Sequence, residues 1–346
     1  AQCNCAYWHG VFGGLYLPHL RQAVYTNLLE AESLCNTVRF NGKPFVELHR
    51  GDFDADGTQE VYLRNERVGI LLSPREGGAA YELDYLPARF NVLNTLRRQP
   101  EAYHKLVAAA GGEIVEGASI HDQLRSKEAG LERLLTYDRH LRGSLIDHFL
   151  AFDESPSTLI GRTYYELGDF VGKPYEVSIR DSDQVPSVEL SRTASVVDNR
   201  IAIKKSIILL DEEDGLLIQY SVKNLSKIPL TIIFAPEFNF ALLSGNSPDR
   251  YCTDDQSGEK ETLNTIGASS GITKFSLMDE GDHLGIHFIF AEPTEIWRFP
   301  CETVSQSEEG FERVYQSSCV LPVFRLKEEP GEVFEVQFKL VFELLS

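Results

Sequence analysis

The sequence predicts a mainly-β protein, namely a large antiparallel β-sandwich preceded by a short helical segment. Its C-terminal segment alternates apolar with mostly polar residues, which is typical of a strand with one buried face. The apolar positions are Phe334, Val336, Phe338, Leu340 and Phe342. From residue 141 onward, strand-like runs follow one another without alternating helices, which argues against an α/β barrel. With 346 residues, 42% of them hydrophobic and 25% charged, the chain is long enough for one large domain or two smaller ones.

A helix is expected near the N-terminus, over residues 18–35. Pro18 suits a first helical turn, and apolar residues recur along one side, at Leu20, Val24, Leu28, Ala31 and Cys35. Because a single amphipathic helix cannot bury its apolar stripe alone, this helix has to pack on another part of the structure. The polar stretch 41–60 that follows places a boundary near residues 36–42. It divides the chain into 1–40, the end of a helical segment, and 41–346, the sandwich.

The remaining predicted elements are mostly strands. We expect a hairpin over 61–72 that turns at Asn65 and Glu66, and further strands over 79–85, 201–210, 216–223, 272–277, 284–291 and 311–317. Two helical patches, over 100–110 and 127–137, interrupt them. For Trp297, burial in the sandwich is favoured over a role as a sugar-stacking platform.

Charge and composition narrow the classes of partner. The chain has 33 basic against 52 acidic residues, a net charge of −19, and such a surface repels nucleic acid but not a neutral ligand. No run of about 18 apolar residues predicts a membrane span, and no signal peptide is visible. The six cysteines show no disulfide or zinc spacing, so we expect reduced thiols and a cytoplasmic location. The absence of an initiator Met favours a clipped or partial chain over mature processing.

A Trp-His pair stands directly ahead of the predicted helix, in the run Tyr7-Trp8-His9-Gly10. An indole stacks on a pyranose face, an imidazole bonds a hydroxyl group, and Gly lets a ligand approach the backbone. These residues therefore make one wall of a saccharide-binding cleft a reasonable hypothesis. A core Trp beside a hydrogen-bonded His is the alternative, and the residues alone leave both open.

An acidic loop over residues 51–60 has the composition of a calcium site. Ca²⁺ takes about six to eight oxygen ligands, and alternate side chains on a tight turn point inward together. Gly57 permits the bend, whereas Leu63 stands where an EF-hand would place its closing Glu, so this is not an EF-hand. The sequence favours Ca²⁺ over a solvated acidic turn, with the ligands Asp52, Asp54, Asp56, Thr58 and Glu60.

Two further polar pairs were weighed as site residues. Glu82 and Asp84 alternate on one strand and face one side, whereas a glycosidase needs a carboxyl group on each side of the scissile bond. Polar capping or a contact at the sandwich edge is therefore the favoured role for this pair. Glu237 and Asn239 remain open between sugar binding and satisfying the backbone.

Several segments, in order along the chain, resemble glycoside hydrolase family 57, the group of α-amylases and 4-α-glucanotransferases. They are residues 6–14, 77–85, 94–98, 144–149 and 303–308. The whole chain resembles the C-terminal half of these enzymes. The family consists of an irregular (β/α) barrel, a small helical bundle and a large lectin-like, galactose-mutarotase-like β-supersandwich. The resemblance implies that 1–40 corresponds to the end of the bundle and 41–346 to the sandwich.

The resemblance also implies a role in α-glucan chemistry. In the family the Trp-His segment lines the active-site cleft, so Trp8 and His9 would contact substrate. The family reaction is retaining, with a Glu nucleophile and an Asp acid/base, both on the barrel upstream of these residues. We expect this chain to provide one cleft wall and a scaffold, with the upstream barrel and a maltooligosaccharide as partners, and to leave maltooligosaccharides uncleaved on its own. The alternative is a free-standing, non-catalytic α-glucan-binding module; a homodimer is left open.

Overall fold

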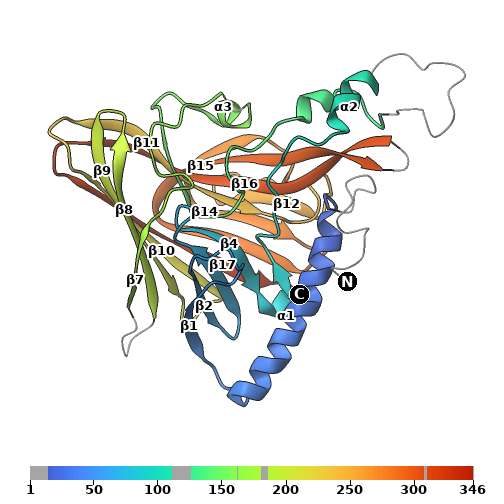
Figure 1. Ribbon diagram of the computed structural model, residues 1–346, viewed down its shortest axis with the longest axis horizontal. Helices are drawn as coiled ribbons and strands as arrows, with labels where there is room; N and C mark the ends of the chain where they lie inside the picture. Colours follow the sequence, from blue (N-terminus) through green and yellow to red (C-terminus); the bar gives the residue numbers. More distant parts are fainter. Residues whose placement is uncertain (1–14, 111–125, 162, 181–185, 308–309, 346) are drawn as a thin grey trace, which may run out of the picture.

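Strands dominate the computed structural model of the chain, shown in Figure 1, which describes residues 15–110, 126–161, 163–180, 186–307 and 310–345. They form antiparallel sheets in two layers around one large core. The predicted mainly-β sandwich with a short N-terminal helix is confirmed.

The first layer is a long run of antiparallel strands. Its order is β13 (Glu261–Thr262), β12 (Arg250–Asp254), β14 (Gly267–Asp279), β15 (Leu284–Ser307), β17 (Val333–Leu344), β10 (Gly215–Asn224), β9 (Asn199–Leu209), β8 (Ser187–Val196) and β7 (Glu176–Arg180). In β17 the predicted alternation is confirmed, because Phe338, Leu340 and Phe342 are buried and the residues between them are not.

The second layer combines a five-stranded sheet with three further strands. The small sheet contains β1 (Val46–Gly51), β2 (Glu60–Asn65), β3 (Val68–Ser73), β4 (Ala79–Tyr85) and β5 (Phe90–Asn91) in that order. A bridge between Ala80 and Ser144 joins it to the approach to β6 (Ile146–Leu150), which pairs with β11 (Leu230–Phe240), which in turn pairs with β16 (Gly310–Glu328). The first part of β15 pairs with β14 and β17 and its second part with β16, so this strand connects the two layers.

Aromatic rings fill the space between the layers. Phe238 of β11 lies 5.1 Å from Phe288 of β15 and 5.9 Å from Phe338 of β17, measured between ring centroids. A smaller core behind β6 and β11 contains Trp297 and is covered by α3 (Pro156–Ile160). Trp297 is 1% exposed and its indole nitrogen donates to Glu295 Oε1 at 2.7 Å. The expectation that it is buried in the sandwich is confirmed.

The helical elements differ from the prediction in length. α1 (Pro18–Phe40) continues past the predicted end at residue 35 and stops at Asn41, which adopts a left-handed conformation with φ of 53°. α2 (His104–Ala110) begins four residues into its predicted range, and the patch at 127–137 contains only a single 3₁₀ segment, η4 (Leu131–Leu134). Val107 and Leu131 pack with Phe311 in a small cluster, and such tertiary contacts outweigh local helix propensity.

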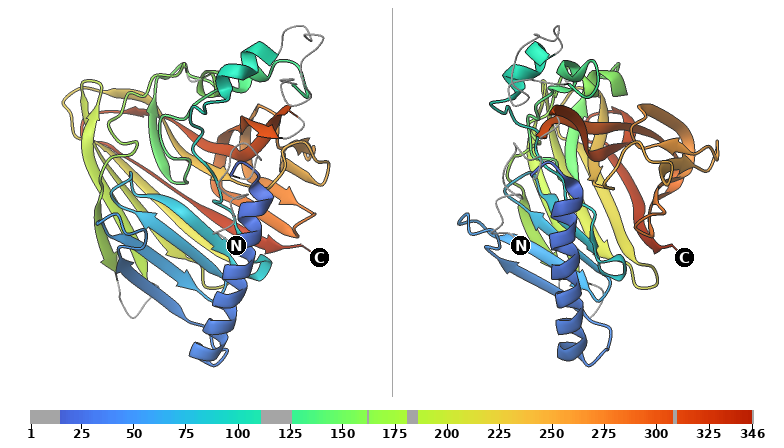
Figure 2. Two further views of the ribbon diagram at one scale, coloured as in Figure 1. Left: turned by 45° about the vertical axis from the view of Figure 1, so that its right-hand side comes forward. Right: turned by 90° about the vertical axis from the view of Figure 1, so that its right-hand side faces the viewer.

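α1 turns the C-terminal part of its apolar stripe away from the sandwich. The helix packs against β5 and the 3₁₀ segment η3 (Leu86–Ala88), alongside the five-stranded sheet (Figure 2), and buries Gln22, Leu29 and Asn36 on that side. Gln22 is held there because its amide donates to the carbonyl of Arg89 at 3.2 Å. Leu28 of the predicted stripe is 55% exposed. Leu20 and Val24 of the stripe are half-buried, whereas Leu28, Ala31 and Cys35 are exposed.

Two further expectations concern helices and cysteines. Within the described ranges, no helix is both long and apolar enough to cross a membrane. The four cysteines in these ranges, Cys35, Cys252, Cys301 and Cys319, are free thiols, and all but Cys35 are buried.

Candidate functional site

The predicted cleft residues Tyr7, Trp8, His9 and Gly10 lie outside the described residues. The described chain begins at Leu15, three residues before α1, and Leu15 lines a pocket beside the first turns of that helix. This pocket is thus the described feature nearest in the chain to the Trp-His segment.

The pocket lies between α1 and β4 and has a volume of about 450 Å³, within the usual size of small-molecule sites. Its apolar lining comes mainly from α1 and the chain after β5. Its polar and aromatic lining residues are Arg21, Tyr25, Tyr81, Glu82, Asn94 and Thr95. Aromatic side chains beside hydrogen-bonding groups of both kinds suit a ligand with apolar faces and many hydroxyl groups.

Arg21 joins three parts of the chain around this pocket. Its guanidinium donates to Asn94 Oδ1 at 3.0 Å, to the carbonyl of Leu15 at 2.5 Å and to Gln316 Oε1 at 3.2 Å. Gln316, on β16, donates in turn to the carbonyl of Tyr16 at 2.8 Å. Burial lowers the pKa of Arg21 to about 10, so it stays charged at neutral pH. The entry to α1 is therefore fixed to β16 and to the chain after β5.

Glu82 lines this pocket, and Asp84 lies two residues further along the same strand. Asp84 is fully buried, and neither of its carboxyl oxygens accepts a hydrogen bond from any N–H or O–H group of the described residues. Burial raises the pKa of Asp84 well above its usual range, and the neighbouring Glu82 raises it further. Burial also raises the pKa of Glu82, which lines the pocket. Since two adjacent carboxyl groups cannot both ionise readily in such surroundings, burial favours keeping a proton on this pair.

This pair does not provide acid and nucleophile for glycoside cleavage. Both side chains project from one strand to one side, as the sequence predicts, and no second carboxyl group lines the opposite wall of the described pocket. The favoured role as a polar cap or a contact at the sandwich edge stays a prediction, although Asp84 is fully buried. The pocket can bind and orient a ligand, with Glu82 accepting hydroxyl hydrogen bonds.

The loop over 51–60 brings three of its five predicted calcium ligands together. Carboxylate oxygens of Asp52, Asp54 and Glu60 lie within 4.8 Å of one another. Asp56 instead accepts from the backbone N–H of Thr58 at 2.8 Å, and its second oxygen lies 3.4 Å from Arg75. Asp52, Asp54 and Glu60 therefore form a group of three carboxylates. Asp56 and Thr58 are hydrogen-bonded to each other instead.

Glu237 and Asn239 lie on β11 next to each other in a buried polar cluster. Asn239 donates to Glu237 Oε1 and to the carbonyl of Gly143, both at 2.7 Å. Asn239 thus satisfies the backbone, which was one of the two roles left open. Sequence reasoning missed the partners of Glu237, which are Arg142, His140 and His148, because these lie 89 to 97 positions away and only pairing of β6 with β11 brings them together.

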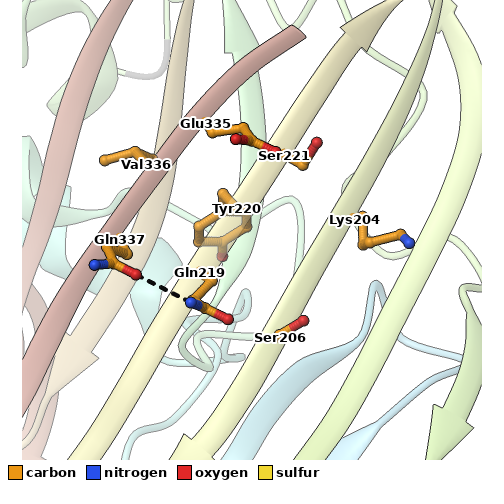
Figure 3. A pocket seen from close by; sticks show the side chains of 8 residues that line it. All are labelled: Lys204, Ser206, Gln219, Tyr220, Ser221, Glu335, Val336 and Gln337. Carbon is orange, nitrogen blue, oxygen red and sulfur yellow. Dashed lines mark hydrogen bonds between the residues drawn. The ribbon is translucent and has the colours of Figure 1, made fainter.

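A separate hollow lies on the outer face of β9, β10 and β17 and has a volume of about 360 Å³ (Figure 3). Its lining consists mainly of outward-facing polar side chains of adjacent strands, and Gln219 donates to Gln337 across it at 3.0 Å. Tyr220 is buried beneath it at 2% exposure. The hollow is a feature of the pleated sheet surface, with no converging set of polar groups.

Comparison with known families matches nearly the whole chain. Residues 52–338 match the family described as alpha-amylase/4-alpha-glucanotransferase, C-terminal, and residues 1–35 match the middle domain of the same enzymes.

Individual relatives agree with this match. "Alpha-amylase 1" of Dictyoglomus thermophilum is 33% identical over 98% of this chain and 47% of its own length. A 4-alpha-glucanotransferase of Thermococcus kodakarensis is 33% identical over 98% of this chain and 46% of its own length. The crystal structure of 4-alpha-glucanotransferase from Thermococcus litoralis superposes with a TM-score of 0.74 and 27% identity, covering 99% of this chain and 45% of that one. The chain therefore spans about half the length of the curated relatives it matches.

Proposed function

Since this chain belongs to the alpha-amylase/4-alpha-glucanotransferase family, of which it forms the C-terminal part, we propose that it binds and orients an α-glucan for a retaining hydrolase or transglycosylase. The pocket beside α1, together with Tyr7, Trp8, His9 and Gly10, forms one wall of the glucan cleft. The groups that break the bond belong to the half of the relatives that has no counterpart in these residues.

The pocket between α1 and β4 is the observation that carries this proposal. It combines the rings of Tyr25 and Tyr81 with the acceptor Glu82 and the polar groups of Asn94 and Thr95. A pyranose ring presents apolar C–H faces and hydroxyl edges, so it satisfies both kinds of group. The net charge of −19 does not oppose a neutral glucan.

The exposed side of α1 supports an upstream partner within the same enzyme. Leu28, Leu34 and Val38 expose 55%, 64% and 79% of their surface, which is unusual for three large apolar residues on one helix. Residues 1–35 match the middle domain of the relatives. We propose that the rest of that middle domain packs on this side of α1 and that the barrel lies beyond it.

Calcium and location are separate parts of the proposal. The carboxylates of Asp52, Asp54 and Glu60 support a structural Ca²⁺ ion, since clustered carboxylates favour a hard cation. The free thiols of the described cysteines support a reducing compartment such as the cytoplasm. The homodimer that the sequence left open is tested by sedimentation of the purified protein.

Titration with maltotriose tests the proposed cleft wall. We expect Tyr25→Ala to weaken binding about tenfold, because it removes an aromatic wall of the pocket. Leu34→Ala is the matched control, since Leu34 lies on the same helix and does not line the pocket. Equal affinities of the two variants, measured by calorimetry, would refute the role of this pocket.

A further inference from the structure

A second pocket shares Tyr81 with the pocket beside α1. It has a volume of about 330 Å³ and is lined by side chains from β4, from the chain ahead of β6 and from the chain after α3. Besides Tyr81, the lining includes His140, Tyr164 and Glu166. None of these three residues was singled out from the sequence, and the proposed cleft wall does not use them.

A buried carboxylate, Glu237, contacts the lining residue His140. Glu237 accepts from Arg142 Nη1 at 2.9 Å and from Asn239 at 2.7 Å through Oε1, and from His148 Nε2 at 3.0 Å through Oε2. Burial raises the pKa of Glu237, but Arg142 and His140 lower it by more. The pKa of Glu237 therefore falls well below its usual range. Glu237 is therefore ionised and acts only as an acceptor.

His148 is a buried cation between two carboxylates. Its Nδ1 lies 2.6 Å from Glu166 Oε2, and its Nε2 contacts Glu237. Burial lowers the pKa of His148, yet Glu166 and Glu237 raise it well above its usual value. Both ring nitrogens thus carry protons and both are engaged. Together with Arg142 and Arg98, His148 offsets the charges of Glu166, Glu237 and Asp138.

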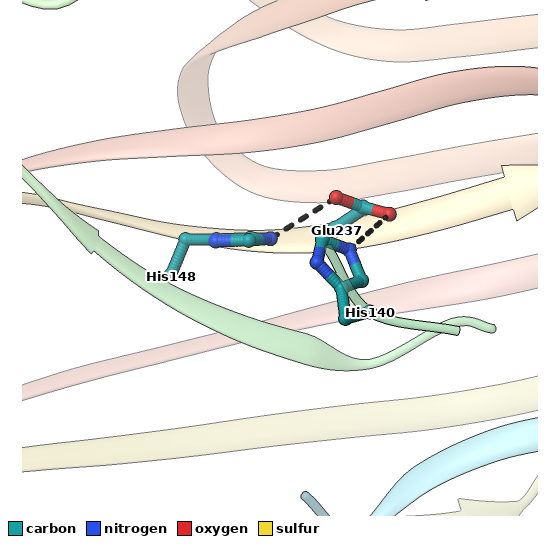
Figure 4. A group of neighbouring side chains, drawn as sticks. All are labelled: His140, His148 and Glu237. Atoms are coloured by element: carbon teal, nitrogen blue, oxygen red, sulfur yellow. Dashed lines mark hydrogen bonds and ion pairs between the residues drawn. The ribbon is translucent and has the colours of Figure 1, made fainter. Parts of the chain in front are cut away.

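His140 faces this pocket with a hydrogen-bond acceptor. Its Nε2 lies 3.3 Å from Glu237 Oε1, as Figure 4 shows, and because Glu237 only accepts, Nε2 carries the proton. Burial lowers the pKa of His140, so the ring is neutral at pH 7 and Nδ1 has a lone pair. No hydrogen bond to Nδ1 is formed by any group in the described ranges, and the side chain is 10% exposed.

A metal ion is a poor occupant of this cluster. Ligand atoms of His140, His148 and Glu237 lie within 4.8 Å of one another. However, Arg142 stands 2.9 Å from the same Glu237 oxygen, and both nitrogens of His148 are protonated and bonded to carboxylates. A cation would have to displace these partners and sit beside a guanidinium.

A small anion is also a poor occupant of this pocket, because residues of both charge signs line it. The second carboxylate oxygen of Glu166 accepts from the backbone N–H of Phe149 at 2.9 Å, so Glu166 stays fixed at the wall of the pocket. Tyr81 and Tyr164 add aromatic surface, and the ring of Tyr164 lies edge-on to His148 at 6.0 Å. A neutral, polyhydroxylated ring fits acceptors, donors and aromatic walls together.

We propose that this pocket is a second saccharide-binding site, which takes one or two sugar units with His140 Nδ1 accepting a hydroxyl hydrogen bond and Tyr81 and Tyr164 flanking the ring. That the sugar belongs to an α-glucan rests on the proposed function, whereas the binding site itself does not. Because Tyr81 lines both pockets, the site extends the glucan path from the cleft wall across β4.

Nitrogen NMR of the whole chain with ¹⁵N-labelled histidine tests this site locally. Maltose is the probe, and the His140 signals are assigned by their loss in His140→Gln, whose amide can still donate to Glu237. We expect the Nδ1 resonance of His140 to shift saturably with maltose while that of the exposed His283 stays in place. Because the readout belongs to His140, it reports on this pocket whatever Tyr25→Ala does at the cleft wall.

Two neighbouring tyrosines give a matched pair of variants. Tyr164→Ala should weaken the maltose titration of His140 about tenfold, whereas Tyr165→Ala, at a 73% exposed residue, should leave it unchanged. Should Tyr164→Ala fail to fold, His140→Gln provides the second test, by a loss of maltose binding in calorimetry. An unmoved Nδ1 resonance, equal behaviour of Tyr164→Ala and Tyr165→Ala, or a shift caused by inorganic phosphate instead of maltose would overturn the proposal.

Discussion

A buried ion pair between the two layers provides a quantitative test of how the sandwich is held together. Lys205 of β9 is fully buried, and its ammonium donates to Asp147 of β6 at 2.9 Å. The same ammonium donates to the carbonyls of Gly77 at 2.9 Å and Leu145 at 2.6 Å, and Tyr175 donates to Asp147 at 2.7 Å. These contacts join β9 of the first layer to β6 and to the chain between β3 and β4 in the second.

Replacing Asp147 with Asn keeps the shape of this cluster and removes its negative charge. The Lys205 charge then remains buried with carbonyl partners only. Leaving one member of a buried pair uncompensated costs about 3–5 kcal/mol. Adding Lys205→Met to this variant removes the stranded charge, so we expect the double variant to recover part of the loss.

The surface pair beside it is the control. Lys204 lies 3.2 Å from Glu189 and its side chain is 52% exposed, so Lys204→Met should cost about 0–1 kcal/mol. Urea unfolding of the four proteins, followed by fluorescence and circular dichroism, measures the free energy of unfolding. If Asp147→Asn loses less than Lys204→Met, or the double variant is less stable than Asp147→Asn alone, the reasoning about this pair is wrong.

Three other predictions concern acid stability, the core and calcium. Burial raises the pKa of Asp138, but Arg142 and Arg98 bring it from 3.8 down to about 2. The folded state thus gains about 2 kcal/mol that is present above pH 4 and lost as the pH falls towards 2, and Asp138→Asn should flatten this part of the stability curve measured by urea unfolding. Phe238→Ala removes a ring between the layers and should lower the free energy of unfolding by about 3–5 kcal/mol; a loss below 1 kcal/mol would contradict the packing. A chelator should lower the melting temperature of the wild type but not of Asp54→Ala, and an absence of any chelator effect on the wild type would count against Ca²⁺.

Much of the fold was predictable because local patterns and tertiary demands agree. The alternating C-terminal segment, the hairpin at Asn65 and Glu66 and the strand over 79–85 are all confirmed. The sequence was less informative for α1. Periodicity identified a stripe that includes Leu28, but the helix packs on the sandwich through Gln22 and Asn36. A periodic stripe shows that a helix has an apolar side and does not show which partner covers it.

The candidate sites were only partly predictable, since their geometry depends on residues far apart in the chain. The sequence places Glu82 and Asp84 on one side of a strand, but their raised pKa values come from burial in the folded structure, which local sequence does not show. His140 and Glu237 are 97 positions apart, and no local spacing signals their contact. The acidic loop is local, and there the structure brings together three of the five predicted residues, Asp52, Asp54 and Glu60.

Saturation-transfer NMR of maltotriose mixed with these 346 residues tests the central claim most directly, because one sample reports both binding and turnover. We expect magnetisation to pass from the protein to maltotriose while the spectrum of the sugar stays unchanged during prolonged incubation. Absence of transfer, or the appearance of glucose, maltose or longer oligosaccharides, would contradict the proposal that these residues bind an α-glucan without cleaving it.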